Sequence, residues 1–562
     1  MKFSEMPYVR PDLEAMKAKG AETVERLKKA ACGKEQERIY RDFETISNSA
    51  ETMGTIAYVR HSINTRDEFY AQEQDWMDQV GPQMEQIRQE VSLALLDSPY
   101  RDELEQLLGK VFFTNMEISV RSFKPELMEL MAEENKLVSS YQKLCASAMV
   151  EFDGKTMPMP MLGPYKMSQD RDVRKAAYET EGRFYDEHRQ ELDEIYDSLV
   201  KNRTAQGKLM GYENFLPLAY DRLGRNCYGP EEVASFRQQV VRDLVPLLEK
   251  IKQGQKTRLG LEKLYFWDDG IRFPDGNAKP MGTAEDILKA GLDMYHDLSP
   301  ETAEFIDFMY ENELLDVLSK DGKAPGGYCT SLPDYKAPFI FSNFNGTSGD
   351  VDVLTHEAGH AFADYRAVRQ GYVRASQSPT IESCECHSMS MEFLTQDFHK
   401  NFFGDATRKY EIAHCEDALF FIPYGCLVDE FQHRVYENPE LTPQQRNELW
   451  QELEMKYRPW MDFGDLPFYS RGALWQRQLH IYLLPFYYID YCLAQTVAFQ
   501  FWIASMEDRA DAWKRYLSFL DKGGTQTFEQ LVHGAGLKVP YDAGCVHEIC
   551  TAVSRWLEEN PI

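Results

Sequence analysis

Two histidines and a glutamate stand at a spacing that suits metal-assisted hydrolysis. The run His356-Glu-Ala-Gly-His360 puts two imidazoles four residues apart. On a helix, positions i and i+4 lie on one face, so both rings can reach a single ion. Glu357 follows the first histidine, where its carboxylate can take a proton from a metal-bound water. This HExxH pattern predicts a zinc centre with Glu357 as the catalytic base.

A hydrolytic zinc site needs a third protein ligand and a fourth position that stays open. The segment after Thr380 reads as a helix and carries the candidates Glu382, Cys384, Glu385, Cys386 and His387. A carboxylate suits hydrolysis best, and we expect the two cysteines to serve packing. Glu392 follows Glu385 by two helical turns and is placed to orient a ligand histidine. Spacing alone does not choose between Glu382 and Glu385.

A second group of polar aromatic side chains lies downstream. The segment from His480 to Tyr491 holds a histidine and several tyrosines, among them Tyr487 and Tyr488. Tyr488 and Tyr491 are three residues apart, which puts them on one helical face. Tyrosine hydroxyls can stabilise the negative charge of a tetrahedral intermediate, although aromatic stripes at helical spacing usually belong to a core.

The elements that must position these residues are mostly helices. Apolar residues at helical spacing run from Pro11 to about Leu108 and again through most of the later chain. A Pro- and Gly-rich break at Gly154 to Pro164 predicts a turn or short strands. We therefore expect a mainly α protein with a helical N-terminal lobe, residues 1–165, and a larger catalytic lobe, residues 166–562.

A short strand is expected just before the metal-binding helix. Phe339 to Phe344 is apolar and β-favouring, and Asn345-Gly346 predicts a tight turn after it. We interpret Phe339 to Asn345 as an edge strand that pairs with an extended substrate, which makes Phe344, Asn345 and Gly346 candidate substrate-binding residues. Asp350 or Asp352 is the expected helix cap.

Composition excludes several classes of partner. The formal net charge of −29 disfavours binding to nucleic acid or to an anionic membrane surface. The 11 cysteines are scattered and form no paired knuckle, and no secretory signal is visible, so a reducing cytoplasm is the expected location. The apolar stretch Leu479 to Ala504 contains polar and charged residues and is expected to be a buried helix that does not span a membrane.

These motifs carry a family resemblance. From about Met167 onward the chain resembles the thimet oligopeptidase and oligoendopeptidase F family of zinc metallopeptidases, and most closely the oligoendopeptidase F and Pz-peptidase branch. The likeness is strongest in GGYCTSLPDYKAPFIFSNFNGTSGDVDVLTHEAGHAF and in the helix that contains Glu385. In that family the third ligand is a glutamate with a second glutamate seven residues on. The resemblance therefore implies Glu385 as the ligand, with Glu392 as its partner.

The resemblance also implies a function. It implies two helical lobes around a deep channel, a small sheet beside the HExxH helix, and one Zn²⁺ per chain. The expected activity is endopeptidase cleavage of short unstructured peptides by attack of a metal-bound water. Tyr491 would stabilise the oxyanion with Tyr488 and His480, the last matched with a one-residue slip, and Tyr487 would contact substrate. A zinc hydrolase of non-peptide amides and a non-catalytic peptide-binding protein are the alternatives from the residues alone.

Overall fold

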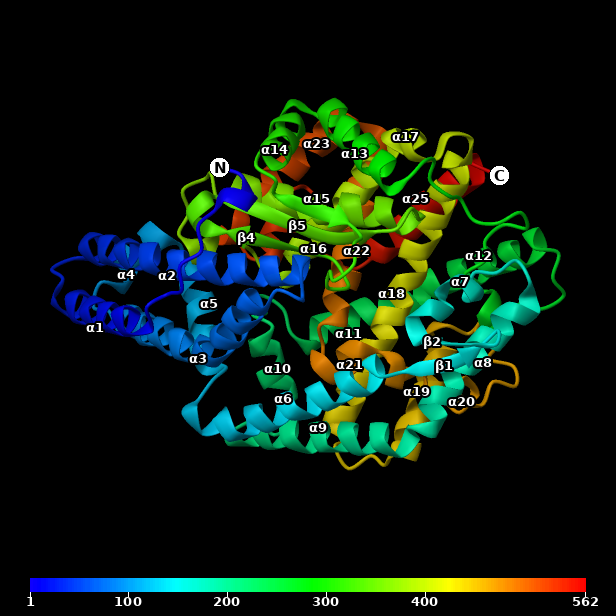
Figure 1. The fold of residues 1–562 in the computed structure, drawn as a ribbon, viewed down its shortest axis with the longest axis horizontal. Helices are drawn as coiled ribbons and strands as arrows, with labels where there is room; N and C mark the ends of the chain where they lie inside the picture. Colours follow the sequence, from blue (N-terminus) through cyan, green and yellow to red (C-terminus); the bar gives the residue numbers. More distant parts are fainter. Residues whose placement is uncertain (562) are drawn as a thin grey trace. The chain divides into compact units, whose positions relative to one another are not determined.

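The computed structural model describes residues 1–561, which form a mainly α-helical protein with small sheets, as expected (Figure 1). The chain divides into two compact units, each assembled from three stretches. Unit 1 comprises Met1–Arg121, Lys279–Thr407 and Val497–Val539. Unit 2 comprises Ser122–Ala278, Arg408–Thr496 and the described residues from Pro540 onward. The boundaries of these compact units differ from the expected boundary at residue 165. The division into two lobes at residue 165 remains a prediction.

The N-terminal part of unit 1 is a group of helices around a shared apolar core. Aspartates start two of them: Asp12 accepts a hydrogen bond from the Ala15 amide, and Asp67 caps the third helix. The core is built from buried side chains such as Leu27, Ile39 and Phe112. The helices are α1 (Leu13–Lys29), α2 (Gly33–Ile63), α3 (Glu68–Leu96), α4 (Arg101–Leu108) and α5 (Lys110–Arg121).

The rest of unit 1 holds a three-stranded sheet and the helices that pack near it. Strands β3 (Leu315–Leu318), β4 (Tyr328–Leu332) and β5 (Ala337–Phe344) lie in the order β3-β5-β4. β5 is parallel to β3 and antiparallel to β4. The helices are α13 (Ala284–Leu298), α14 (Pro300–Glu311), α15 (Ser348–Ala367), α16 (Ile381–Leu394), α17 (Lys400–Phe403), α23 (Arg509–Leu520) and α24 (Phe528–Gly534).

Unit 2 is helical apart from one hairpin. Strands β1 (Met149–Phe152) and β2 (Lys155–Pro158) pair antiparallel across Asp153-Gly154, which both have positive φ, as a two-residue hairpin turn requires. The predicted break near Gly154 is therefore this hairpin and the 3₁₀ turn after it. The helices are α6 (Met128–Ala146), α7 (Gly163–Lys166), α8 (Arg171–Glu187), α9 (Arg189–Leu209), α10 (Leu216–Arg222), α11 (Pro230–Gln239), α12 (Val245–Arg258), α18 (Thr407–Glu437), α19 (Pro443–Tyr457), α20 (Pro467–Ser470), α21 (Leu479–Leu483), α22 (Tyr488–Glu507) and α25 (Cys545–Glu559), with α18 and α22 running across the unit boundaries.

The apolar stretch Leu479 to Ala504 is not the single helix that its composition predicts. α21 ends at Leu483, Phe486 takes a left-handed φ of 67°, and α22 begins at Tyr488. Pro485 disfavours helical backbone at the residue before it, which explains the interruption. Within residues 1–561 we find no helix with the length and apolar character that crossing a bilayer requires.

Candidate functional site

Helices α15 and α16 carry the predicted metal-binding residues and pack unusually closely. α15 supplies His356, Glu357 and His360, and α16 supplies Glu385. A Cβ placed on Gly359 of α15 would lie 2.7 Å from the Ser388 Cα of α16. Real Cβ atoms do not approach that closely, so the glycine inside the HExxH motif permits this helix contact.

The contact brings three ligand-type side chains together. The ligand atoms of His356, His360 and Glu385 all lie within 4.8 Å of one another. The Nε2 atoms of His356 and His360 lie 3.4 and 3.5 Å from Glu385 Oε2. Atoms that share a tetrahedral zinc ion at about 2.1 Å lie ~3.4 Å apart, so the spacing of this group suits the ion.

Glu392 lies behind the first histidine. Its Oε1 atom is 2.7 Å from Nδ1 of His356, whose Nε2 faces Glu385. A carboxylate on the second ring nitrogen fixes the tautomer and the orientation of the imidazole, and makes the other nitrogen a better ligand. This geometry is what the seven-residue spacing of Glu385 and Glu392 led us to expect.

Burial and the neighbouring histidines shift the pKa values of the Glu385 and Glu357 carboxyl groups in opposite directions. Burial by itself raises the pKa of Glu385, but hydrogen bonds and charge from His356 and His360 outweigh it, so the pKa is lowered. At Glu357, which is half-buried, burial is the largest effect, and its pKa is raised despite the two histidines. The two carboxylates therefore differ, one held ionised and one with increased proton affinity.

The other candidate ligands on α16 have different surroundings. His387 is buried against the Phe519 ring at 5.6 Å, and burial lowers its pKa to about 3. The carboxylate of Glu382 accepts a hydrogen bond from the Thr380 hydroxyl, close to the start of the helix. Across the described residues, neither of them joins the three-residue group, nor do Cys384 and Cys386.

The predicted edge strand is wrong. β5 pairs with β4 along Ala337 to Phe341 and with β3 at Ile340, Phe341 and Phe344, so it is the central strand. An added substrate strand needs an outer position, which only β3 or β4 occupies in this sheet. β3 was missed because Leu315–Leu318 reads equally well as the end of a helix.

The predicted turn follows β5, but the predicted helix cap is wrong. Phe344 is buried, Gly346 has a φ of 85°, and Thr347, not an aspartate, is the N-cap of α15. Asp350 lies in the first helical turn and accepts hydrogen bonds from the amides of Asn345 and Gly346. The carboxylate thus fixes the turn that leads into the metal-binding helix.

His480 and the three tyrosines form one aromatic group within unit 2. The His480 ring lies 5.7, 4.9 and 6.3 Å from the rings of Tyr487, Tyr488 and Tyr491. All four side chains are half-buried, whereas Ile489 between them is fully buried. Burial lowers the pKa of His480 and raises that of Tyr488, so both side chains favour their neutral forms.

A buried ion pair anchors the start of α22 beneath this group, and no pattern in the sequence points to it. The Arg225 guanidinium donates to the Phe486 carbonyl at 2.6 Å and to Asp490 at 2.8 Å. Gln432 accepts a hydrogen bond from the Phe486 amide at 3.1 Å, and Tyr228 donates to Asp490. These bonds hold Phe486 in a backbone conformation that is costly for a non-glycine residue.

Comparison with known families decides the class of protein. The model of peptidase family M3 matches residues 164–549, and the model of the peptidase M3 N-terminal domain matches residues 3–123. The chain belongs to peptidase family M3. The HExxH helix and the α16 helix both lie inside the matched range, so the predicted resemblance and the assignment as a metalloendopeptidase are confirmed.

Relatives of this M3 peptidase cover most of its length. The solved structure of Pz peptidase A is 46% identical with a TM-score of 0.93, and the alignment covers 99% of each chain. A structure from Bacillus anthracis strain Ames, provisionally assigned as an oligoendopeptidase F, is 42% identical with a TM-score of 0.88 over 100% of this chain and 98% of that one. The plasmid oligoendopeptidase F of Lactococcus lactis subsp. cremoris is 23% identical over 74% of this chain and 71% of its own.

Proposed function

We propose that this M3 peptidase is a zinc-dependent endopeptidase that hydrolyses internal bonds of short unstructured oligopeptides. The observation that carries the proposal is the group of two imidazoles and one carboxylate, spaced as ligands of one zinc ion. The similarity to oligoendopeptidase F and Pz peptidase A supports oligopeptides as the substrate class. One Zn²⁺ per chain follows from the single group of this kind among residues 1–561.

Each residue then has a defined task. His356, His360 and Glu385 would hold the ion, which when bound polarises the scissile carbonyl and lowers the pKa of the attacking water. Glu357 accepts the proton of that water and delivers it to the leaving amine, and its raised proton affinity is compatible with both steps. Glu392 holds the His356 ring in place through Nδ1.

For the oxyanion we propose Tyr491 as the main hydrogen-bond donor, with Tyr488 and His480 assisting. All three rings are half-buried, and burial favours the neutral forms of His480 and Tyr488, which can donate to a developing negative charge. Tyr487 and the turn residues Asn345 and Gly346 remain proposed substrate contacts, whereas Phe344 is buried in the central strand and is not accessible to a substrate. A deep substrate channel and a cytoplasmic location are likewise part of the proposal, and the scattered positions of the 11 cysteines support a reducing compartment.

The decisive variant is Glu357→Gln. It keeps the size of the side chain but removes the proton acceptor, so we expect kcat on a quenched oligopeptide to fall by at least about 100-fold while bound zinc stays stoichiometric. Peptide cleavage is followed by fluorescence and zinc by atomic absorption. A variant that retains near-full activity would refute the assigned base. Wild-type protein that hydrolyses simple amides but no peptide would refute the substrate class.

A further inference from the structure

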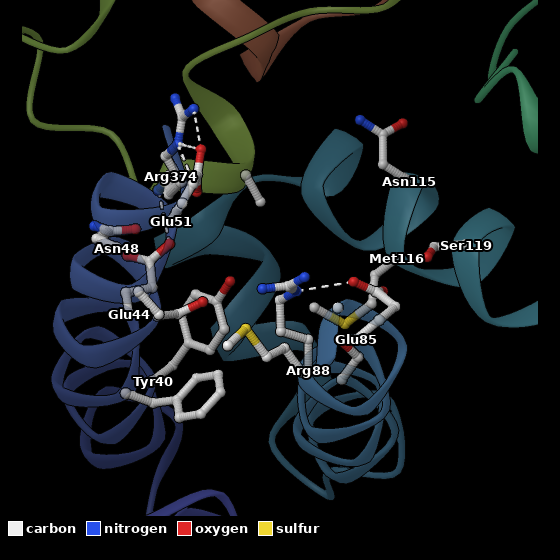
Figure 2. Close-up of a pocket in the computed structure, with 18 of the residues that line it drawn as sticks. Tyr40, Glu44, Asn48, Glu51, Glu85, Arg88, Asn115, Met116, Ser119 and Arg374 are labelled. Atoms are coloured by element: carbon white, nitrogen blue, oxygen red, sulfur yellow. Dashed lines mark hydrogen bonds and ion pairs between the residues drawn. The ribbon is translucent and has the colours of Figure 1, made fainter. Parts of the chain in front are cut away.

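Unit 1 contains a cavity that the proposed chemistry does not use. It has a volume of about 530 Å³ and lies between α2, α3, α5 and the 3₁₀ turn Arg374–Ser376 (Figure 2). This volume is in the range of about 300–1,000 Å³ that is typical of small-molecule pockets. None of the proposed metal ligands, nor Glu357, lines it.

Much of the lining is apolar and adaptable. Phe43, Met84, Phe112 and Met116 line the cavity, and each is at most 9% exposed. Methionine side chains are flexible and polarisable, so a lining that contains three of them, Met77, Met84 and Met116, can accept apolar groups of different shape. This surface suits an alkyl or aromatic body.

One buried carboxylate, Glu44, also lines the cavity. Glu44 is 9% exposed, and its Oε1 atom accepts a hydrogen bond from the Arg374 amide at 2.7 Å. Within the described chain no lysine, arginine or histidine forms an ion pair with this carboxylate. Burial, the largest effect, raises the pKa of Glu44 to about 7. A bound cation would offset the cost of ionising a carboxylate that is largely removed from water.

The other charges that face Glu44 are already paired. On α3, Arg88 donates to Glu85 at 2.9 Å. From the 3₁₀ turn, Arg374 donates to Glu51 of α2 at 2.6 Å, and Figure 2 marks both pairs with dashed lines. On α2, a hydrogen bond with Tyr40 and the charge of Arg41 lower the pKa of Glu44 by less than burial raises it. The α5 side chains that line the cavity, such as Asn115, are all uncharged. The lining therefore has one more carboxylate than it has guanidinium groups.

We propose that this cavity binds a protonated amine that has an alkyl or aromatic substituent. The ammonium group would lie at Glu44, and the substituent would pack against Phe43, Met84, Phe112 and Met116. The N-terminus of a hydrophobic peptide and a free alkylamine both have this chemistry. Binding of a simple amine does not depend on the proposed function, whereas binding of a peptide N-terminus rests on it.

Calorimetric titration of the full-length Glu357→Gln protein with hexylamine tests the site without interference from cleavage. We expect hexylamine to bind at least 10-fold more tightly than N-hexylacetamide, which lacks the charge. Glu44→Gln should weaken hexylamine binding by a similar factor. The matched control is Glu90→Gln on α3, an exposed glutamate that does not line the cavity, and it should leave binding unchanged.

A second variant keeps the test informative if Glu44→Gln disturbs folding. Ser47 is half-buried and lines the cavity, so Ser47→Trp should fill it and abolish hexylamine binding while Glu44 stays in place. Circular dichroism verifies the fold of each variant. Absence of hexylamine binding to the unmodified cavity, equal binding of the acetylated probe, or unchanged binding in either variant would overturn the proposal.

The pH profile and a peptide competitor complete the test. Hexylamine stays charged between pH 6 and 8 while Glu44 ionises, so its affinity should rise by about 10-fold over this range and stay flat in Glu44→Gln. A flat profile in the unsubstituted cavity contradicts the role of Glu44.

Displacement of hexylamine by Leu-Leu-amide, but not by its N-acetyl form, assigns the site to peptide N-termini. Failure to displace assigns it to free amines and leaves the zinc chemistry untouched.

Discussion

Glu392 illustrates how a carboxylate outside the three-residue group can orient one of its histidines. It accepts a hydrogen bond from Nδ1 of His356, the nitrogen that faces away from the ligand group. The bond selects the tautomer whose Nε2 has a free lone pair. The ligand and its orienting partner come from different helices, so the orientation of the ring depends on how α15 and α16 pack.

Glu392→Gln tests this at the residue scale. The amide is a poorer acceptor than the carboxylate and does not make the imidazole more basic, so we expect zinc affinity to fall by about 10–100-fold. Competition with a coloured chelator measures the affinity directly, without substrate. Glu311→Gln, which changes an exposed glutamate at the end of α14, provides the control. If Glu392→Gln leaves the affinity for zinc unchanged, the contact does not orient the His356 ring for metal binding.

At the scale of elements, the metal group depends on a close approach of two helices. The Gly359 backbone lies against His387 and Ser388 of α16, and any Cβ there must push the helices apart. The side chain of His356 would then move relative to Glu385, because they belong to opposite helices. The small residue inside the motif thus sets the distance between ligands.

We therefore expect Gly359→Ala to cost about 1–3 kcal/mol of stability through overpacking and to weaken zinc binding by at least 10-fold. Thermal unfolding and chelator competition give the two values. Gly254→Ala is the matched control, since Gly254 is a helical glycine of α12 with open space at its Cβ position, and it should be neutral or slightly stabilising. Equal zinc affinity in both variants would contradict the spacing argument.

The anchor of α22 supports a second prediction at this scale. Asp490→Ala leaves the Arg225 guanidinium buried without its carboxylate and weakens the support for Phe486, so we expect a loss of about 3–5 kcal/mol. The exposed pair of Lys175 and Asp465 provides the control, because Asp465→Ala should cost less than about 1 kcal/mol. Denaturant titration distinguishes the two. If Asp490→Ala lowers the free energy of unfolding no more than Asp465→Ala does, the buried pair does not contribute the expected stability.

The sequence predicted local features well and long-range arrangements poorly. The helix of His356 and the helix of Glu385 followed from residue spacing, although the predicted aspartate cap was wrong. The strand at Phe339 to Phe344 followed from its β-favouring run. The central position of that strand did not, because β3 comes from a segment with an ambiguous pattern. The Arg225–Asp490 anchor was not predictable either, since its partners lie 265 residues apart and an isolated arginine carries no signal.

At the scale of the whole molecule, all the proposed zinc ligands belong to unit 1, while His480 and its tyrosines belong to unit 2. The family models do not share these limits, since they match residues 3–123 and 164–549. The predicted lobes, residues 1–165 and 166–562, lie closer to the family limits than to the compact units. A family model describes stretches of sequence that are inherited together, whereas a compact unit consists of stretches that pack together in the folded chain.

Removal of zinc should therefore act unevenly across the molecule. A ligand that binds only the native state stabilises it by about 2.7 kcal/mol at a free concentration 100 times Kd. We expect chelation to increase hydrogen exchange in α15 and α16 and to leave α9 of unit 2 unchanged, with recovery after zinc is added back. Mass spectrometry of exchanged peptides resolves these helices. A uniform increase across both units would contradict a metal site confined to unit 1.

The interleaved path of the chain has a consequence for its synthesis. α23 contacts α16 through two side chains. The Phe519 ring lies against the His387 ring, and the Tyr516 hydroxyl donates a hydrogen bond to the His387 carbonyl at 2.7 Å. A ribosome that adds about 5–20 residues per second needs roughly 7–27 s to proceed from Glu385 to Phe519. The α1–α5 core can assemble long before then, whereas α16 acquires this support only after α23 has been synthesised. We expect newly made chains to capture metal only once α23 has left the ribosome.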